Sequence, residues 1–505
     1  MNTPERFLYP LEKGAHIMHK ITEFKFIPVT ETSTPFAAAA EKCSFSSIGY
    51  AEDEYFQTGT ANVYEEDAEH KLSVKFADAP YTTRVLIRRP TDAAKFSGNV
   101  VIEILNSSAN IDIDRMWVDS WPFFTRNGDI YVGISSKGHI VDSLKGFDAE
   151  RYAAINWDNP DPNPEVPEFV KSGLMKYLPQ YELGLFWDML VDLSCLLKTD
   201  CEMNPIREYG KVRLFLTGWS QSTFYVNRMI RSFCYDGSGL EDLYDGFLNG
   251  GGGATMAPLN NTQTLALGDM SGLTSGVLGS RKPFIALNTE SDSRMANFYG
   301  DFDEPDFKFR AWEIAGTSHD SNYNLVEYYG EKDLKMLEGL GIYNAYYGVD
   351  GEPLDTYYEA VFNAAWKALY AWTIEGRPAP HAPRFVTERT SEDIPGIAGM
   401  KMHIRHVADA FGNTRGGIRT PAVDHPTAKI CYYCTYENGF INGAFGKENP
   451  FSAELLTELY GTLAHYEELV NEDYTRAVAE GFLLEEDRAE YLGRLLAKAK
   501  ARGLK

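Results

Sequence analysis

The sequence predicts an α/β protein with a mostly parallel, doubly wound sheet, an antiparallel amino-terminal part, and helices added as a cap and at the carboxyl end. Apolar strand-like runs alternate with helix-like segments over roughly 200 residues, which is typical of a parallel sheet covered by helices. Before them, residues 48–90 form short runs that alternate aromatic or apolar side chains with polar ones and are separated by short turns, which favours several short antiparallel strands. A chain of 505 residues with 44% hydrophobic and 13% aromatic residues can also build a large core.

The individual elements follow in chain order. After the antiparallel start, strands are predicted at Asn99–Leu105, Asp129–Ser135, Val212–Leu216, Tyr244–Asn249, Pro283–Asn288 and Phe309–Ile314. Helices are predicted around Trp117–Arg126, Tyr181–Leu197, Leu354–Thr373 and Leu455–Lys500. The proline-rich residues 156–168 predict a loop. We therefore expect a single decorated domain over residues 1–505, with a core at about 45–325, a helical insertion or cap at about 324–400 and a helical region at about 450–505.

Charge and composition exclude several classes of function. Asp and Glu outnumber Lys and Arg by 72 to 48, so the formal net charge is −24, and such a surface repels nucleic acid and anionic membranes. The first residues show no signal-peptide pattern, and no apolar run reaches the roughly 20 residues of a membrane span. Six cysteines with one close pair, Cys431 and Cys434, predict reduced thiols rather than a zinc site or disulfides. We expect a cytoplasmic protein that acts on a small molecule without a metal or cofactor, and the sequence leaves a homo-oligomer open.

The most informative segment is Gly218-Trp219-Ser220-Gln221-Ser222, which follows a strand-like run and precedes a helix-like one. A serine on a sharp turn between a strand and a helix, flanked by small residues, is the nucleophile elbow of α/β-hydrolases. The next helix points its positive amino-terminal end at the reacting oxygen. The alternative is an ordinary turn with a serine that caps the helix. We interpret Ser220 as a nucleophile and the fold as that of an α/β-hydrolase.

A serine nucleophile needs a base, and the base needs an acid that holds its tautomer. In α/β-hydrolases these residues follow in the order serine, acid, histidine. His319, in a loop of small residues after the strand at 309–314, is the predicted base. The acid is predicted in the turn after the strand at 283–288, where Glu290 is preferred and Asp292 remains the alternative.

Other histidines fit the role of base less well. His139 follows the strand at 129–135 and lies upstream of the serine, which breaks the expected order. His403 and His406 flank Arg405 in a polar stretch and are interpreted as surface residues.

The oxyanion of an acyl-transfer reaction needs two hydrogen-bond donors. One is predicted to be the backbone N–H of Gln221, the residue after the nucleophile. The other is predicted in the loop 106–110, at Ser107, because small residues let a backbone amide approach the substrate. Asn106 and Trp219 flank these donors, and we expect them to contact the substrate.

With these residues placed, the chain resembles a family of largely uncharacterised bacterial α/β-hydrolase-domain proteins, many described only as esterases. The segments that carry the resemblance are Tyr50–Tyr64, Pro80–Pro90, Gly98–Asn106, Gly218–Ser222, Thr289–Asp292, Ala315–His319, Gly416–Asp424 and Gly481–Asp487. The resemblance implies that Ser220 and His319 are nucleophile and base, and that the acidic turn supplies the third residue. Arg419, in the segment 416–424, is a candidate anchor for a substrate carboxylate, although a structural ion pair is the preferred role for any single arginine. One departure is Thr223, where a glycine or another small residue is expected after the elbow.

The predicted function is that of a serine hydrolase that cleaves carboxylic esters of a small molecule through a Ser-His-Glu/Asp triad and an acyl-enzyme. An acyltransferase would use the same triad, with an alcohol or amine in place of water. A non-catalytic binding protein on the same scaffold is the third class.

Overall fold

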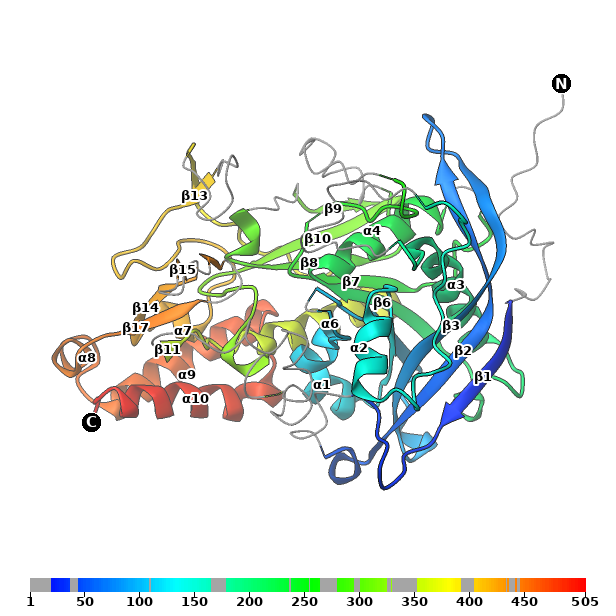
Figure 1. The fold of residues 1–505 in the computed structure, drawn as a ribbon. Coiled ribbons are helices and arrows are strands. Elements are labelled where there is room, and N and C mark those ends of the chain that lie inside the picture. Colours follow the sequence, from blue (N-terminus) through cyan, green and yellow to red (C-terminus); the bar gives the residue numbers. More distant parts are fainter. Residues whose placement is uncertain are drawn as a thin grey trace. The chain divides into compact units, whose positions relative to one another are not determined.

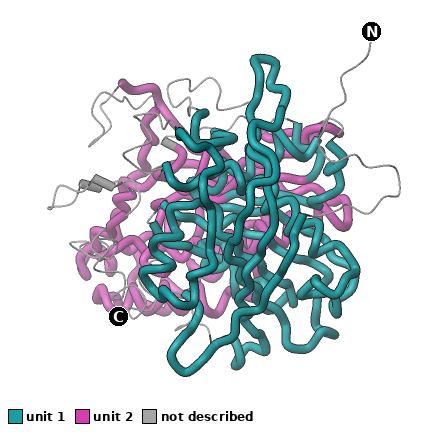
Figure 2. The backbone as a smooth tube through the Cα atoms, turned by 45° about the vertical axis from the view of Figure 1, so that its right-hand side comes forward, with its two compact units in different colours: residues 1–249, 254–282, 330–343 teal, residues 250–253, 283–329, 344–505 magenta. Residues whose placement is uncertain are grey.

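The computed structural model describes residues 20–36, 44–108, 110–164, 179–235, 238–253, 255–263, 279–294, 300–324, 328, 352–391, 404–432, 434–435, 441–442 and 446–505. The chain divides into two compact units, teal and magenta in Figure 2. Unit 1 comprises residues 1–249, 254–282 and 330–343, and unit 2 comprises residues 250–253, 283–329 and 344–505. The single decorated domain stays a prediction.

Unit 1 is built on a sheet whose strands lie in the order β1-β2-β3-β5-β4-β6-β7. These strands are β1 (Ile21–Ile27), β2 (Tyr50–Glu66), β3 (Leu72–Pro90), β4 (Asn99–Ile104), β5 (Ile130–Ile134), β6 (Arg213–Trp219) and β7 (Gly246–Gly250). The neighbours β1, β2, β3 and β5 pair antiparallel, whereas β4 pairs parallel with both β5 and β6. The predicted antiparallel start and parallel centre of the sheet are confirmed (Figure 1).

The central strand β4 shows why the sequence pattern predicts this arrangement. Every residue of β4 is buried, and Val100, Val101, Ile102 and Ile104 are completely inaccessible. A parallel strand covered on both faces is apolar along its whole length, unlike a strand with one face in water. Its one charged residue, Glu103, accepts hydrogen bonds from the amides that begin the following helix, and burial raises the pKa of this carboxyl to about 8.

The antiparallel part differs in detail from the prediction. We expected several short strands in residues 48–90, but β2 and β3 are single strands of 17 and 19 residues, drawn in blue in Figure 1. They are joined by one turn, in which the Asp67 carboxylate accepts from the amides of Glu69 and Lys71 at 3.0 and 2.8 Å. The local alternation is right, but the turn signals inside the strands do not interrupt them.

The helices of unit 1 are α1 (Arg115–Asn127), α2 (Ile140–Phe147), α3 (Phe186–Lys198) and α4 (Gln221–Ser232). The helix predicted from Tyr181 begins later, at Phe186, after a short 3₁₀ turn. It is buried along nearly its whole length, and the Asp188 carboxylate fixes it to β2 by accepting from the hydroxyl of Tyr64 at 2.7 Å and the amide of Asn62 at 2.8 Å. Buried polar groups of this kind are stable only when they are hydrogen-bonded.

Unit 2 begins with β8 (Phe284–Thr289), β9 (Phe302–Glu304) and β10 (Phe307–Ile314), of which β8 and β10 pair parallel. Its later strands are β11 (Glu352–Pro353), β12 (Thr387–Arg389), β13 (Ile404–His406), β14 (Ala428–Cys431), β15 (Cys434–Thr435), β16 (Ile441–Asn442) and β17 (Lys447–Pro450). Its helices are α6 (Glu359–Glu375), α7 (Pro421–Asp424), α8 (Ala453–Tyr460), α9 (Leu463–Glu480) and α10 (Arg488–Ala501).

The helical predictions for unit 2 are confirmed where the structure describes them. The helix predicted at 354–373 corresponds to α6, which begins five residues later, at Glu359, and the region from 455 is α8, α9 and α10, with a left-handed glycine, Gly481, at the end of α9. Of the predicted cap at 324–400, the structure describes residues 324, 328 and 352–391, which include α6. The rest of the cap lies outside the described residues. Within the described part of the chain, no helix is both long and apolar enough to span a membrane.

Candidate active site

Ser220 is the single residue between β6 and α4. Its backbone has φ 54° and ψ −119°, a left-handed conformation that residues other than glycine rarely adopt. The flanking residues Trp219 and Gln221 are buried, whereas Ser220 itself is partly exposed. A strained residue of this kind persists only where the surrounding structure holds it, and such residues cluster at functional sites.

The residues around Ser220 explain how the strain is held. A Cβ atom on Gly218 would lie 2.8 Å from the carbonyl oxygen of Ser222, so only glycine fits there. Thr223, which departs from the expected small residue, donates from its amide and its hydroxyl to the Ser220 carbonyl at 3.0 and 2.7 Å. The threonine therefore closes the turn and does not crowd it.

The loop after β4 is fastened to this turn. The Asn106 side chain donates to the Trp219 carbonyl at 2.9 Å and accepts from the amide and hydroxyl of Ser108 at 2.8 and 2.6 Å. The Trp219 ring is buried, with the Arg115 guanidinium 5.8 Å from the centre of the ring. These contacts give both residues a role in building the elbow, and their substrate contacts stay a prediction.

The two predicted oxyanion donors both belong to unit 1. Gln221 is the first residue of α4, where backbone amides point out of the helix end and the helix dipole is positive. Ser107 is fully buried, and among the described residues its hydroxyl has no hydrogen-bond partner. The Ser107 carbonyl lies 3.0 Å from Nε2 of His139, so that histidine contacts the backbone of the loop.

The histidine and acid turns meet in unit 2. Because β8 and β10 are parallel neighbours, the turns at their carboxyl ends lie at the same edge of the sheet. His319 Nδ1 lies 2.7 Å from Asp292 Oδ1, and both side chains are partly exposed. The other oxygen of Asp292 accepts from the amide and hydroxyl of Thr289 at 3.1 and 2.6 Å, which fixes the carboxylate. The His319 amide donates to the Ser291 hydroxyl at 2.9 Å, so the two turns are also joined through the backbone.

The preference for Glu290 as the partner of His319 is therefore corrected in favour of Asp292. One Glu290 oxygen accepts from the Gly316 amide at 2.7 Å, and the other accepts from the Thr414 hydroxyl. Glu290 follows the strand directly and turns into the protein, whereas Asp292 lies in the next turn and reaches the imidazole. Glu290 thus ties the acid turn to the histidine turn from the buried side.

The interpretation of His406 as a surface residue was wrong. Its side chain is buried, with Nε2 2.8 Å from the Ser293 hydroxyl and Nδ1 3.0 Å from the Tyr432 hydroxyl. His406 therefore supports the acid turn, because Ser293 also donates to the Glu290 carbonyl at 2.8 Å. Strand alternation was the available signal, since it places His406 on the face opposite the exposed Arg405. His403 lies outside the described residues.

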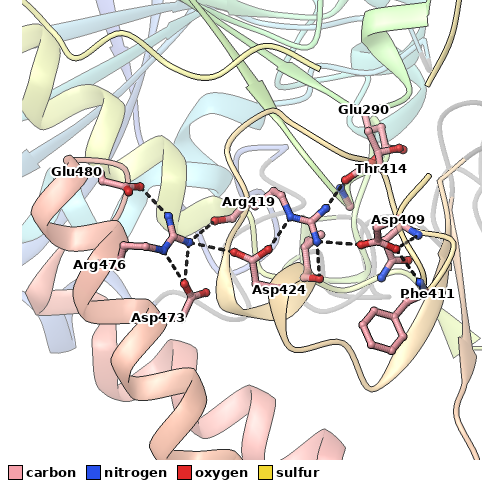
Figure 3. A network of polar contacts seen from close by, with 12 residues as sticks. Glu290, Asp409, Phe411, Thr414, Arg419, Asp424, Asp473, Arg476 and Glu480 are labelled. Atoms are coloured by element: carbon pink, nitrogen blue, oxygen red, sulfur yellow. Dashed lines mark hydrogen bonds and ion pairs between the residues drawn. The ribbon is translucent and has the colours of Figure 1, made fainter. Parts of the chain in front are cut away.

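Arg419 does not present its charge to a ligand. Its guanidinium donates to Asp424 at 2.5 Å, to Asp409 and the Val423 carbonyl at 3.0 Å each, and to the Thr414 carbonyl. Figure 3 shows this network between Asp424 and Asp409, with Thr414 leading on to Glu290. Four of its five N–H donors are thus taken up by the protein, which favours the structural ion pair over the substrate anchor.

The same chain of charges continues to α9. Arg476 donates to Asp424 at 3.0 Å, to Asp473 and Glu480 at 2.7 Å each, and to the carbonyl of Arg419 at 3.2 Å (Figure 3). The segment that carries Arg419 is therefore anchored to a helix of the carboxyl-terminal region.

Cysteines and metal sites complete the comparison with the sequence. Cys195, Cys201 and Cys234 are free thiols, but Cys431 is disulfide-bonded, which corrects the expectation of a fully reduced set. Across the described ranges, no group of three or more His, Cys, Asp or Glu residues is arranged to hold a metal ion. The cytoplasmic location stays a prediction.

Comparison with solved structures finds distant likenesses. A cold-adapted esterase from an Arctic intertidal metagenomic library is 11% identical, with 52% of this chain and 85% of that chain covered and a TM-score of 0.25. The esterase Est22 is 12% identical, with 60% and 82% covered and a TM-score of 0.31. An alpha-beta serine hydrolase homologue from Coxiella burnetii is 9% identical, with 52% and 92% covered and a TM-score of 0.24.

No curated protein matches the chain. Among protein families, the model described as "Alpha/beta hydrolase domain" matches residues 22–493, which is most of the sequence. The mixed α/β fold, with its parallel central strands and antiparallel start, agrees with this match. The chain therefore belongs to the α/β-hydrolase domain family.

Proposed function

We propose that the protein is a serine hydrolase that cleaves carboxylic esters of small molecules. The observation that carries the proposal is the left-handed backbone of Ser220, the one residue between a buried strand and a helix. A serine held in this strained conformation presents its hydroxyl at the end of the sheet, where a nucleophile of this fold is expected to lie. We propose that the hydrogen-bonded Asp292–His319 pair of unit 2 serves as the acid and base for this serine.

In the proposed reaction, Ser220 attacks the ester carbonyl while His319 takes the serine proton. Asp292 accepts from Nδ1–H of His319, so the tautomer with a free Nε2 lone pair is favoured and the imidazolium that forms is stabilised. The amides of Gln221 and Ser107 bind the oxygen that becomes negative in the tetrahedral intermediate. His319 then gives its proton to the leaving alcohol, which leaves the acyl-enzyme. In the second half of the reaction, water attacks the acyl group while His319 takes its proton, and His319 returns that proton to Ser220 as the acid is released.

The direct test is the hydrolysis of short-chain p-nitrophenyl esters by the wild type and by Ser220→Ala. We expect kcat of the variant to fall by about a thousandfold or more, because the acyl-enzyme cannot form. Ser73→Ala, which removes an exposed serine of β3, is the matched control and should keep wild-type rates. A fluorophosphonate probe should label the wild type and Ser73→Ala but not Ser220→Ala.

The outcomes also separate the rival functions. Near wild-type turnover in Ser220→Ala would reject this nucleophile. A wild type that is labelled, but passes its acyl group to an added alcohol in preference to water, would be an acyltransferase. A wild type that neither reacts with the probe nor turns over any ester would be a binding protein on the hydrolase scaffold.

A further inference from the structure

The loop that follows β5 places a lysine inside unit 1. The Lys137 side chain is fully buried, and its Nζ donates to the Ser136 hydroxyl at 2.7 Å and to the Ser222 hydroxyl at 3.4 Å. Nζ also lies 4.4 Å from the centre of the Tyr225 ring, within the range of a cation–π contact. Lysines are almost never fully buried unless they are paired, so this placement calls for a reason.

The two serines that Lys137 contacts converge on one carbonyl. Ser136 donates to the Leu105 carbonyl at 2.7 Å, and Ser222 donates to the same oxygen at 3.2 Å. Lys137 therefore completes a closed hydrogen-bonded cluster made of one ammonium, two hydroxyls and one carbonyl. All four groups are buried, so water does not compete for these bonds.

The cluster joins the two parts of the chain that carry the predicted oxyanion donors. Leu105 is the first residue after β4 and lies two positions before Ser107. Ser222 belongs to α4 and is the neighbour of Gln221. Lys137, Ser136 and Ser222 thus connect the loop that carries Ser107 to the helix that begins at Gln221.

Stability alone does not account for a lysine here. Burial lowers the pKa of Lys137 to about 7, against the opposing effect of Asp112, the acidic group that faces it. Asp112 is itself paired with the Arg84 guanidinium at 3.1 Å and bonded to Ser135. A buried charge of this kind is generally matched or exceeded in stability by an apolar residue of similar volume.

We propose that Lys137 is a positioning residue for the oxyanion hole, acting through Ser136 and Ser222 on the loop that carries Ser107. This inference rests on the proposed hydrolase function. A misplaced oxyanion donor weakens binding of the transition state without changing binding of the ground state. The effect of losing Lys137 therefore falls on kcat and leaves KM nearly unchanged.

The test compares Lys137→Met, whose unbranched side chain is one atom shorter and has no donors, with Lys95→Met at an exposed site. We expect a ten- to hundredfold fall in kcat on a p-nitrophenyl ester for Lys137→Met, KM within threefold of wild type, and no change for Lys95→Met. The affinity for phenylboronic acid, which forms a tetrahedral serine adduct, should fall by about the same factor as kcat.

The double variant Lys137→Met/Ser222→Ala should lose little more than either single variant, because both changes break one cluster. Ser136→Ala and Ser222→Ala serve the same test if Lys137→Met does not fold. Wild-type kcat in these variants, with Ser220-dependent turnover intact, would overturn the inference and leave the proposed function standing.

A readout that does not need activity separates the two failures. Amide hydrogen exchange in peptides covering residues 105–114 should be faster in Lys137→Met, while exchange in α10 stays the same. If the wild type shows no Ser220-dependent hydrolysis, the proposed function fails, and the exchange data still decide whether Lys137 positions the loop. Unchanged exchange at 105–114 would refute that positioning.

Discussion

At the scale of single residues, two carboxylates in one turn have different tasks. Asp292 lies against the imidazole of His319, whereas Glu290 accepts from Gly316 and Thr414 on the buried side. Their spacing in the sequence is equally compatible with either role. Their side-chain contacts are not equivalent.

Asp292→Asn should lower kcat/KM by about a thousandfold, because an amide next to Nδ1 favours the wrong tautomer of His319. Glu290→Gln should cost less than about tenfold, since an amide oxygen can still accept from Gly316 and the Thr414 hydroxyl can reverse its role. Steady-state kinetics of both variants on one ester make the comparison. The opposite order of losses would return Glu290 to the triad.

Lys137 also makes a prediction about stability and pH. Its pKa is about 7 in the folded protein against an ordinary value of 10.5, so between these values the unfolded chain binds more protons than the folded one. The free energy of unfolding of the wild type therefore rises with pH between these two values. Below about pH 7 the folded chain also carries the charge, so the cost of burying it is fully present.

Lys137→Met removes this cost. The free energy of unfolding should rise relative to wild type by more at pH 6 than at pH 9, with a difference on the order of 1–3 kcal/mol. Urea denaturation of both proteins at the two pH values measures it, with Lys95→Met as the control. An equal change at both pH values would show that burial does not lower the pKa of Lys137, and a larger change at pH 9 would show that its pKa is raised.

At the scale of elements, the nucleophile elbow depends on the close approach of the end of β6 to the first turn of α4. Gly218 has no room for a side chain, because a Cβ would meet the backbone of Ser222. Gly493 in α10 is the contrasting case, since a Cβ there would meet nothing within 4 Å.

Gly218→Ala should lower the free energy of unfolding by roughly 1–3 kcal/mol and reduce turnover, because the backbone that holds Ser220 must shift. Gly493→Ala should be neutral or stabilising by up to about 1 kcal/mol, since alanine favours a helix. Denaturant unfolding and ester hydrolysis of the two variants provide the measurement. If both substitutions behave alike, the close approach at Gly218 does not constrain the turn.

The strands and helices were the part of the structure that the sequence predicted best. Continuous apolar runs such as β4 identify parallel central strands, because burial on both faces leaves a strong local pattern. The length of β2 and β3 was missed, since turn-forming residues inside a strand are overruled by the neighbouring strand. The start of α3 was placed too early, because the residues just before Phe186 form a 3₁₀ turn instead of the first turn of the α-helix.

At the scale of the whole molecule, the predictable part of the site is the part encoded locally. Ser220 and its neighbours form one short motif, and the order of serine, acid and histidine follows from the fold class. The contacts of Lys137 and His406 could not be read in the same way, because their partners come from distant segments: Ser222 for the lysine, and Ser293 and Tyr432 for the histidine. Arg419 illustrates the converse, since its loop looked like a binding segment until its acidic partners were known.

The bridge made by Glu290 between the turns that bear Asp292 and His319 has an evolutionary consequence. One carboxylate spans both turns, so adding or deleting a residue in either would break the bridge and leave a buried acid without its donors. We therefore expect relatives to vary in length elsewhere in the chain and to keep the lengths of these two turns, which an alignment of the family would check.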